Sequence, residues 1–405
     1  MGRRIGIVTE TYHPEVGGGE TQARALAEGL ASRGAQVCLV TRRSQPGSPR
    51  RETLGGVEVH RLPPAGGGPF RKWLLALPVA LRLLRMGREL DVLLVCGFRI
   101  LGIPALLAAG AFRIPCILKA DSVGEMSGSF FDAGLARLGL SSRSGPVRAA
   151  LSLRNRLLRR ANAFVAISSV IERELREAGV GAERIRRIPN GIDPVRFAPP
   201  SATERAQLRE RLGLPAAARI VVYTGRLVRT KGLLPLLQAW RELAAGRPDA
   251  RLLLVGSGGL DMHACEAELR DFVERYGLGA SVQFTGAVED VSGYLRAADV
   301  FAFPSEDEAF GLSLAEAMAC GLPSVATDVG GLADLLRDGH NGLRVSAGSV
   351  VSIRDALAVL LDEPERRESL GRAARREAAD GYAIDAVVEA YERLLAPARR
   401  EPAEA

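Results

Sequence analysis

Two carboxylates, Glu308 and Glu316, stand in a segment that joins a predicted strand to a predicted helix. The segment, Pro304–Pro323, follows an apolar run, passes through a polar loop and continues as a helix from about Leu312. The start of such a helix offers N–H groups and the positive end of its dipole, which together bind anions. Gly311 would let a ligand approach the backbone closely. Glu316 could accept hydrogen bonds from the two hydroxyls of a ribose, and Glu308 from a second polyol. The alternative interpretation is that both are solvated charges near a helix end.

Two cations, Arg226 and Lys231, lie in another predicted connection between a strand and a helix, Thr224–Gly232. An arginine binds phosphate as a fork of donors and a lysine binds it as a compact charge, so the pair is suited to a diphosphate. The alternative is that both are solvated loop cations. Only three of the 54 basic residues are lysines, so a lysine in this loop hints that a compact ammonium is needed there.

Short apolar runs alternate with helical patterns along most of the chain, as in βαβ units whose parallel strands are buried on both faces. In the first half, strands are predicted at Ile5–Thr9, Val37–Val40, Val57–His60, Val92–Cys96, Cys116–Lys119 and Phe164–Ile167. In the second half, they are predicted at Ile220–Tyr223, Leu252–Val255, Val282–Thr285, Val300–Phe303 and Ser324–Thr327. Helices are predicted at Glu20–Arg33, Leu233–Leu243, Ala264–Tyr276, Leu312–Cys320 and Ala383–Leu395. We therefore expect two α/β domains whose ligands lie beyond the carboxyl ends of the strands.

Length and composition exclude several classes of protein. The chain has 405 residues, 47% of them hydrophobic, which is ordinary for a globular protein and enough for two domains. No uncharged stretch is longer than the 13 residues of Ile100–Phe112, which is fewer than the roughly 20 residues that a transmembrane helix needs. The five cysteines are widely spaced and are expected to be buried, in a reducing compartment. The four histidines lack the spacing of metal ligands, so no metal site is predicted.

Taken together, the motifs resemble those of family 4 glycosyltransferases, which are retaining enzymes of the GT-B fold. Glu308 and Glu316, with seven residues between them, match the E-x7-E motif of that family, and Arg226 with Lys231-Gly232 matches its phosphate-binding pair. Further matches follow in the family's order at Ala166–Ser168, Ile188–Asp193, Val255–Gly258, Phe284–Gly286, Ala297–Val300 and Val329–Gly331. The resemblance implies an acceptor-binding Rossmann-like domain (1–195), a donor-binding one (196–380) and a C-terminal helix (about 381–397) that returns to the first.

The resemblance also implies roles for individual residues. Arg226 and Lys231 would bind the donor diphosphate and stabilise the leaving nucleotide. Glu308 would hold hydroxyls of the donor sugar, and Glu316 those of the ribose. The other donor contacts would come from Gly18, Gly19, Gly286, Val288, Phe310, Gly311 and Leu312. The donor would be a nucleotide sugar, with UDP- and GDP-sugars favoured. No cofactor and no metal are expected, because the two cations would stabilise the charge that Mg²⁺ stabilises elsewhere.

The acceptor side departs from the family pattern. Many members carry a histidine after a strand of the N-terminal domain, and the corresponding places here, Val95–Phe98 and Leu118–Ser122, have none. Lys119 and Asp121 end a predicted strand and are the acceptor-binding candidates, Asp121 with a catalytic role as well. His13, in the glycine-rich loop, is a third acceptor candidate. A structural salt bridge and a solvated loop histidine are the alternatives. In the family's front-face reaction the departing phosphate can take the acceptor's proton, so a side-chain base is dispensable.

The charge is divided unevenly along the chain. Residues 1–199 carry 30 basic and 16 acidic side chains, whereas residues 200–405 carry 24 and 31. In the segment Phe70–Arg88 one helical arc holds Arg71, Arg82, Arg85 and Arg88. Leucines fill much of the rest, a pattern typical of a helix on an anionic membrane surface, and a second basic stretch runs from Arg137 to Arg160. The alternative is a helix packed on the sheet with a basic edge. Nucleic acid is not predicted, since aromatic residues make up only 5% and no binding motif is present.

The sequence thus predicts an enzyme that moves a sugar from a nucleoside-diphosphate sugar to an acceptor with retention, in glycolipid, polysaccharide or other glycoconjugate synthesis. We expect it in the cytoplasm, peripheral on the inner face of the membrane if the basic segment binds lipid. One alternative is a non-catalytic peripheral membrane protein of degenerate GT-B fold. Another is a nucleotide-dependent oxidoreductase, but that would need G-x-G-x-x-G directly after the first strand, and the glycines arrive late as Gly17–Gly19.

Overall fold

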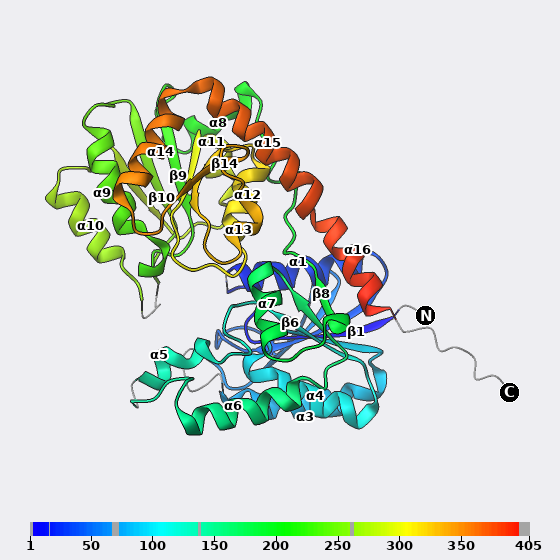
Figure 1. Cartoon of the computed structure of the whole chain (residues 1–405). Helices are drawn as coiled ribbons and strands as arrows, with labels where there is room; N and C mark the ends of the chain where they lie inside the picture. The colour runs from blue at the N-terminus through cyan, green and yellow to red at the C-terminus, as the bar shows by residue number, and fades with distance from the viewer. Residues whose placement is uncertain (1–2, 16, 67–72, 137–138, 260–262, 397–405) are drawn as a thin grey trace. The chain divides into compact units, whose positions relative to one another are not determined.

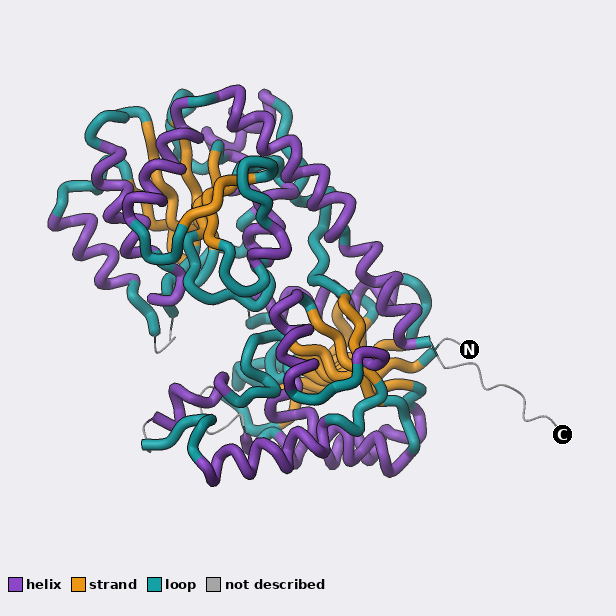
Figure 2. The backbone as a smooth tube through the Cα atoms, in the orientation of Figure 1, coloured by secondary structure: helices purple, strands orange, loops and turns teal. Residues whose placement is uncertain are grey.

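The computed structural model describes residues 3–15, 17–66, 73–136, 139–259 and 263–396. Of these, the residues up to Gly191 and those from Ile384 onward form one compact unit, here the N-terminal unit. Ile192–Ala383 form the second, here the C-terminal unit. The chain therefore divides between residues 191 and 192 and between residues 383 and 384. The domain boundaries predicted from the sequence were 195/196 and about 380/381. In each unit a central sheet has helices on both faces (Figure 2).

The sheet of the N-terminal unit has the order β3-β4-β2-β1-β5-β6-β7-β8 and is parallel except for the β3–β4 pair. Its strands are β1 Arg4–Thr9, β2 Gln36–Arg42, β3 Arg51–Leu54, β4 Val57–Leu62, β5 Val92–Cys96, β6 Cys116–Ala120, β7 Ala163–Ala166 and β8 Ile185–Arg187. Its helices are α1 Gly18–Ser32, α3 Ala76–Met86, α4 Phe98–Phe112, α5 Asp132–Leu135, α6 Gly145–Leu158, α7 Ser169–Glu177 and α16 Ile384–Leu395. The strands β5, β6 and β7 are buried along their whole length, as their continuous apolar runs predict.

The sheet of the C-terminal unit has the order β11-β10-β9-β12-β13-β14 and is parallel throughout. Its strands are β9 Arg219–Thr224, β10 Ala250–Val255, β11 Val282–Gly286, β12 Val300–Phe303, β13 Ser324–Thr327 and β14 Gly342–Val345. Its helices are α8 Ala202–Arg211, α9 Leu233–Ala244, α10 Glu266–Arg275, α11 Ser292–Ala297, α12 Leu312–Ala319, α13 Leu332–Leu335, α14 Val350–Asp362 and α15 Pro364–Tyr382. The order reverses between β9 and β12, and this switch point is where open α/β sheets bind ligands.

The last helix, α16, completes the core of the N-terminal unit (Figure 1). Its side chains Val388 and Tyr391 are buried in the cluster that also holds Leu26 and Leu30 of α1. A Cβ atom at Gly29 would lie 2.6 Å from Cγ2 of Val388, so α1 and α16 approach closely at that glycine. The predicted return of the C-terminal helix to the first domain is confirmed.

Two helices of the N-terminal unit differ in extent from their predictions. The predicted helix Glu20–Arg33 begins earlier, at Gly18, because the amide of Thr21 donates to the carbonyl of Gly17 (2.9 Å) and closes a first turn. Of the predicted interfacial segment, residues 70–72 lie outside the described residues and the helix α3 begins at Ala76. Pro78 falls in the first turn of α3, where a proline costs no hydrogen bond.

Candidate active site

A lysine–carboxylate pair joins the loops that follow the neighbouring strands β9 and β12 of the C-terminal unit. The first loop contains the 3-10 helix Arg229–Lys231, and the Lys231 ammonium contacts Oε1 of Glu308 in the second loop. The hydroxyl of Ser305 lies 3.3 Å from the same oxygen. The two charged side chains keep 15% and 14% of their surface exposed, so both remain accessible.

Close backbone contacts lock these two loops together. A Cβ atom at Gly232 would lie 2.0 Å from the carbonyl oxygen of Pro304, and the amide of Glu306 donates to the carbonyl of Thr230 (2.8 Å). On the other side, a Cβ atom at Gly330 would lie 2.0 Å from the carbonyl oxygen of Glu308. Both glycines also have positive φ angles, of +65° and +55°. The glycines of two motifs are therefore required by the packing that positions Lys231 and Glu308.

Arg226 lies in the same loop as Lys231, with an exposed side chain. The hydroxyl of Tyr223, a buried residue of β9, donates to the carbonyl oxygen of Arg226 (2.8 Å) and anchors this part of the loop. Burial raises the pKa of Tyr223 well above its usual value, with the charge of Glu308 raising it further and that of Arg226 lowering it. The charges of Arg226 and Glu308 thus both act on the end of β9.

Glu316 lies within α12, about one turn after its start at Leu312. Its side chain is half-buried, and burial raises its pKa to about 8, while the charge of Arg196 opposes the shift. Gly311, before the helix, has a φ of +98°, and a Cβ atom there would lie 2.3 Å from Leu332. The structure therefore gives a local reason for Gly311, which the sequence had attributed to the approach of a ligand.

The other predicted donor contacts within the C-terminal unit lie at the same edge of its sheet. Phe310 is buried and packs edge-on against Tyr382, with ring centroids 5.7 Å apart, so its backbone rather than its ring is available to a ligand. Gly286 ends β11 with a φ of +71° and open space where a Cβ atom would be, and half-buried Val288 follows it.

The N-terminal unit has a second lysine–carboxylate pair, at the end of β6. The Lys119 ammonium contacts Oδ1 of Asp121, and Lys119 is buried. Burial lowers the pKa of Lys119, but the charge of Asp121 and its hydrogen bond outweigh that effect and raise it. Two of the three predicted acceptor residues, Lys119 and Asp121, thus lie at the carboxyl end of β6.

Three charged residues around this pair were not predicted from the sequence. The guanidinium of Arg99 donates to Oε2 of Glu10 (3.1 Å) and to the hydroxyl of Ser122 (3.1 Å), and it lies 4.0 Å from the ring centre of Phe130. Glu125 is only 1% exposed and accepts hydrogen bonds from loop amides. A sequence signal existed for each, since all three follow predicted strands, but single charges after strands are too common to single out.

The candidates of the glycine-rich segment, Gly18, Gly19 and His13, lie in different local environments. Gly18 and Gly19 are exposed at the start of α1, in the helix rather than in the loop that the sequence predicts. His13 is half-buried, with Nδ1 3.3 Å from a nitrogen of Arg24, and its carbonyl oxygen accepts from Arg61 (2.5 Å). No contact given by the structure joins His13 to Lys119 or Asp121.

One cluster of metal-ligand types occurs where the sequence predicted none. Cys38 of β2 and Glu58 and His60 of β4 place ligand atoms within 4.8 Å of one another. Nε2 of His60 lies 2.8 Å from Glu58, and Arg82 and Arg51 approach the same two side chains at 3.0 and 2.5 Å. These guanidinium groups already supply positive charge, so we assign no metal to the cluster. All five cysteines are buried and free, as predicted.

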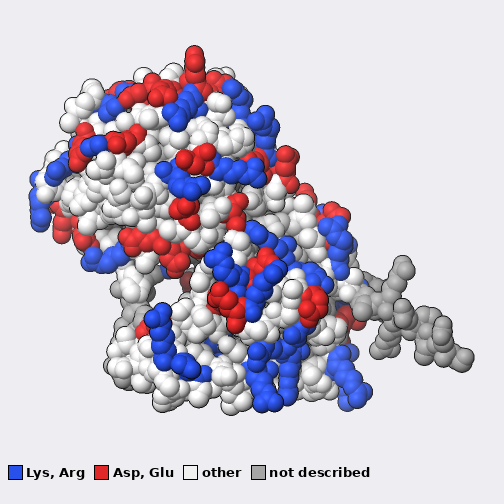
Figure 3. Space-filling model, in the orientation of Figure 1, with Lys and Arg blue, Asp and Glu red and all other residues white. Residues whose placement is uncertain are grey.

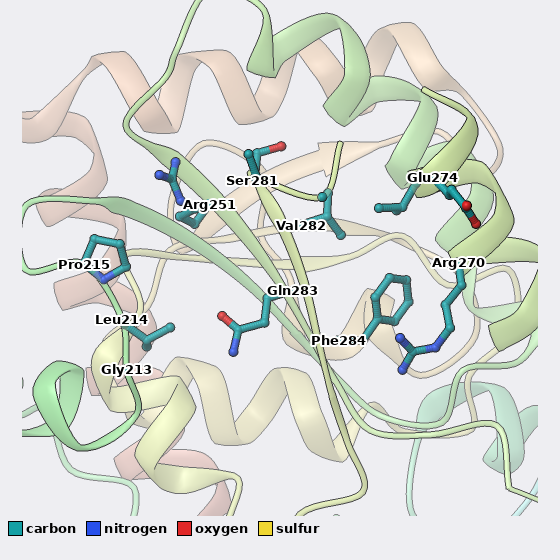
Figure 4. Close-up of a pocket in the computed structure, with 13 residues that line it drawn as sticks. Gly213, Leu214, Pro215, Arg251, Arg270, Glu274, Ser281, Val282, Gln283 and Phe284 are labelled. Carbon is teal, nitrogen blue, oxygen red and sulfur yellow. The ribbon is translucent and has the colours of Figure 1, made fainter. Parts of the chain in front are cut away.

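A pocket in the C-terminal unit lies away from these residues (Figure 4). It has a volume of about 710 Å³ and is lined by the connection before β9, by Arg251 near the start of β10, by α10, by the connection before β11 and by the first three residues of β11. The guanidinium of Arg270 lies 4.4 Å from the ring centre of Phe284 at its wall. Because the lining comes from the amino ends of the strands, this pocket is separate from the loops that hold Lys231 and Glu308.

Comparison with known proteins identifies the family. Residues 17–191 match the model of the glycosyl transferase 4-like domain, and residues 204–377 match that of the glycosyl transferases group 1. The D-inositol 3-phosphate glycosyltransferase of Kineococcus radiotolerans is 30% identical over 94% of this chain and 91% of its own length. The chain belongs to the family 4 glycosyltransferases.

Solved structures agree with this assignment. Sucrose-phosphate synthase of Thermosynechococcus elongatus has a TM-score of 0.81 and 25% identity, over 97% of this chain and 98% of that one. HepE of Anabaena, in complex with UDP and glucose, has a TM-score of 0.77 and 21% identity, over 97% of this chain and 99% of that one. The fold is GT-B and the protein is a retaining glycosyltransferase, as predicted. This excludes the oxidoreductase and the non-catalytic alternatives.

Proposed function

We propose that this family 4 glycosyltransferase binds the diphosphate of a nucleotide sugar with Arg226 and Lys231 and the sugar with Glu308. The observation that carries the proposal is the Lys231–Glu308 pair, held across the loops after β9 and β12 at the switch point of the sheet. A diphosphate that contacts Lys231 takes the place of the Glu308 carboxylate on the ammonium. Glu308 is then free to accept hydrogen bonds from sugar hydroxyls.

The reaction retains the configuration of the anomeric carbon. The bond between that carbon and the diphosphate oxygen breaks, and a bond to an acceptor hydroxyl forms on the same face. The hydroxyl proton passes to the departing phosphate oxygen, whose negative charge Arg226 and Lys231 stabilise. We propose that the two cations replace a metal in this role, so transfer persists when EDTA is present.

The donor is proposed to be a UDP- or GDP-sugar, with the ribose on Glu316 and the base near Gly286 and Val288. Support comes from the open space at Gly286 and from the UDP and glucose in the complex of HepE. In this scheme the start of α12, with Gly311 and Leu312, faces the phosphates.

The acceptor is proposed to be a hydroxyl-bearing sugar, polyol or lipid-linked glycoside that contacts Lys119, Asp121 and His13. D-inositol 3-phosphate belongs among the test compounds, because it appears in the name of a relative that covers most of the chain. A panel for transfer contains D-inositol 3-phosphate, glucose 6-phosphate and n-octyl α-mannoside.

A donor panel tests the proposal directly. UDP-, GDP- and ADP-glucose and the corresponding mannose donors are scored by thermal shift and by hydrolysis, with and without EDTA. We expect one base to raise the melting temperature, and Arg226→Ala to abolish that shift. Arg229→Ala is the matched control, since Arg229 lies in the same loop but pairs with Glu268 (2.7 Å). A shift that survives in the Arg226→Ala variant refutes the phosphate assignment.

We further propose that the N-terminal unit docks on an anionic membrane through α3, α4 and α6. The helix α4 packs against both α3 and α6 (Figure 1). The three helices contain six arginines and no aspartate or glutamate. Leucines of all three are exposed, namely Leu77 (67%), Leu81 (46%), Leu84 (43%), Leu107 (66%) and Leu153 (64%).

Exposed basic side chains accompany these leucines. Arg85 in α3 and Arg148 and Arg156 in α6 are exposed, and Figure 3 shows basic side chains over this part of the N-terminal unit. Apolar side chains that enter the headgroup region, flanked by arginines, are the pattern that binds anionic lipid. In the described part of the chain no helix is both long and apolar enough to cross a bilayer.

Liposome flotation tests the membrane proposal. We expect binding to vesicles that contain phosphatidylglycerol, weaker binding at high salt, and none to pure phosphatidylcholine. Leu77→Glu with Leu81→Glu should release the protein. Val351→Glu, at an exposed apolar position of the C-terminal unit, is the control that should still bind. Equal binding of both variants, or none by the parent protein, contradicts the proposal.

A further inference from the structure

Glu125 holds together the two loops at the carboxyl ends of β5 and β6. Its Oε1 accepts hydrogen bonds from the amides of Asp121 (2.9 Å) and Ser122 (3.1 Å). Its Oε2 accepts one from the amide of Arg99 (3.1 Å), in the first turn of α4. One buried carboxylate therefore fixes the backbone at Asp121 relative to the start of α4, the helix that follows the neighbouring strand β5.

The Arg99 side chain joins the same two loops a second time. Its guanidinium donates to the hydroxyl of Ser122, while its backbone amide donates to Glu125. A backbone hydrogen bond also joins the end of β5 to the end of β6, because the amide of Gly97 donates to the carbonyl oxygen of Lys119 (3.0 Å). These contacts leave the turn at Asp121 little freedom to move independently of α4.

We infer that Glu125 is a positioning residue that holds the Asp121 turn in the geometry required for the acceptor, an inference that rests on the acceptor role proposed for Asp121. A carboxylate at a site 1% exposed is costly to bury, and the fold keeps it where it satisfies three amides at once. Glu125 does not itself contact the acceptor in this scheme. It acts through the backbone of Asp121 and Ser122.

The charges that face Glu125 make its hold dependent on pH. Burial raises its pKa to about 7, Arg99 lowers it, Asp121 raises it and the two loop amides lower it. Arg154, whose guanidinium also contacts the backbone oxygen of Glu125, adds a further positive charge. A protonated carboxyl accepts these hydrogen bonds less strongly than a carboxylate, so the hold should tighten as pH rises through about 7.

Glu174, in α7, provides a matched control because its carboxylate contacts the same loop. Its carboxylate accepts hydrogen bonds from the amides of Gly124 (2.8 Å), Met126 (2.9 Å) and Ser127 (2.8 Å), which flank Glu125 in the chain. Both glutamates order the segment, but only Glu125 contacts the backbone of Asp121 and Ser122. A purely structural role would make the two equivalent.

The experiment compares Glu125→Gln and Glu174→Gln in the full-length enzyme. The donor is the nucleotide sugar selected by the donor panel, and the acceptor is whichever of D-inositol 3-phosphate, glucose 6-phosphate and n-octyl α-mannoside gives the highest turnover. We expect Glu125→Gln to reduce kcat/KM for the acceptor by about tenfold and to change acceptor-free donor hydrolysis less than twofold. Glu174→Gln should change both less than twofold, whatever it does to the melting temperature. Adding Glu125→Gln to Asp121→Asn should cause little further loss.

The outcomes separate this inference from the function beneath it. If Asp121→Asn leaves acceptor kinetics unchanged, the proposed acceptor role of Asp121 is wrong. If Asp121→Asn is impaired while Glu125→Gln behaves like the parent or like Glu174→Gln, the positioning role alone is overturned. If Glu125→Gln does not fold, Glu125→Asp, which keeps the charge but shortens the reach, should show the same loss for the acceptor only. An equal loss in donor hydrolysis by that variant also overturns the inference.

Discussion

Each unit places a lysine–carboxylate pair at the carboxyl edge of a parallel sheet, but the two pairs are built differently. Lys231 and Glu308 come from loops after two neighbouring strands, 77 residues apart, and both keep some exposure. Lys119 and Asp121 come from one strand end, two residues apart, and Lys119 is buried. A ligand can separate the first pair by replacing one partner without disturbing a strand. The second pair is part of the packing of its unit. The difference suggests a pair that exchanges partners on the donor side and a fixed one on the acceptor side.

Removing both cations of the donor loop should have the largest effect. In the Arg226→Ala/Lys231→Ala variant we expect kcat/KM for transfer to fall at least a thousandfold, because both cations that we propose to stabilise the leaving diphosphate are removed. Steady-state kinetics with saturating acceptor measure the loss. The kcat/KM of Arg229→Ala, a variant in the same loop, should stay within threefold of that of the parent. A loss of less than tenfold in the double variant would contradict the role proposed for the donor-side cations.

The next largest effect should be on stability, and it should differ between the two lysines. Lys119→Met leaves the Asp121 carboxylate without its buried partner, which typically costs about 3 kcal/mol. Lys231→Met leaves Glu308 with the hydrogen bond from the Ser305 hydroxyl (3.3 Å), so we expect a smaller cost of about 1 kcal/mol. Calorimetric melting of both variants measures the difference. Equal shifts in melting temperature would show that the two lysine–carboxylate pairs contribute equally to stability, which contradicts the prediction.

The sequence predicted elements well where one pattern was decisive. The strands Val92–Cys96 and Val300–Phe303 have the predicted bounds, because each is an uninterrupted apolar run whose limits leave little choice. The edge strand β3 was missed, since its polar sequence is half-exposed and does not alternate clearly. Gly18 and Gly19 were assigned to a loop because glycine disfavours helices, yet a helix can begin with them where its first amides need no internal partner.

The candidate site was predictable as a set of residues but not as an arrangement. The spacing of Glu308 and Glu316 and the rarity of lysine singled out two loops that the structure places side by side. Lys231 contacts Glu308 because β9 lies beside β12. No local sequence pattern reveals that these two strands are neighbours. Glu125 was invisible for the same reason, since its three amide partners come from two separate loops.

Glu316 should give the smallest effect, and it sharpens the comparison because it is the donor-side group whose charge depends on pH near neutrality. Its pKa is raised to about 8 by burial, so the carboxyl is mostly protonated at pH 7. Ribose hydroxyls donate more strongly to a carboxylate than to a carboxyl, so donor binding should lower this pKa. The affinity for the donor must then increase as pH rises.

The size of the increase follows from the ionised fraction. Between pH 7 and pH 8.5 that fraction grows by about eightfold for a pKa of 8, which sets the upper limit for the gain in donor affinity. Titration calorimetry of the preferred nucleotide sugar at several pH values measures it. Glu316→Gln cannot ionise, so its affinity should be weaker than that of the parent at pH 8.5 and should not change over this range. A pH dependence that persists in Glu316→Gln would assign the effect to another group, and a flat parent profile would remove Glu316 from the ribose site.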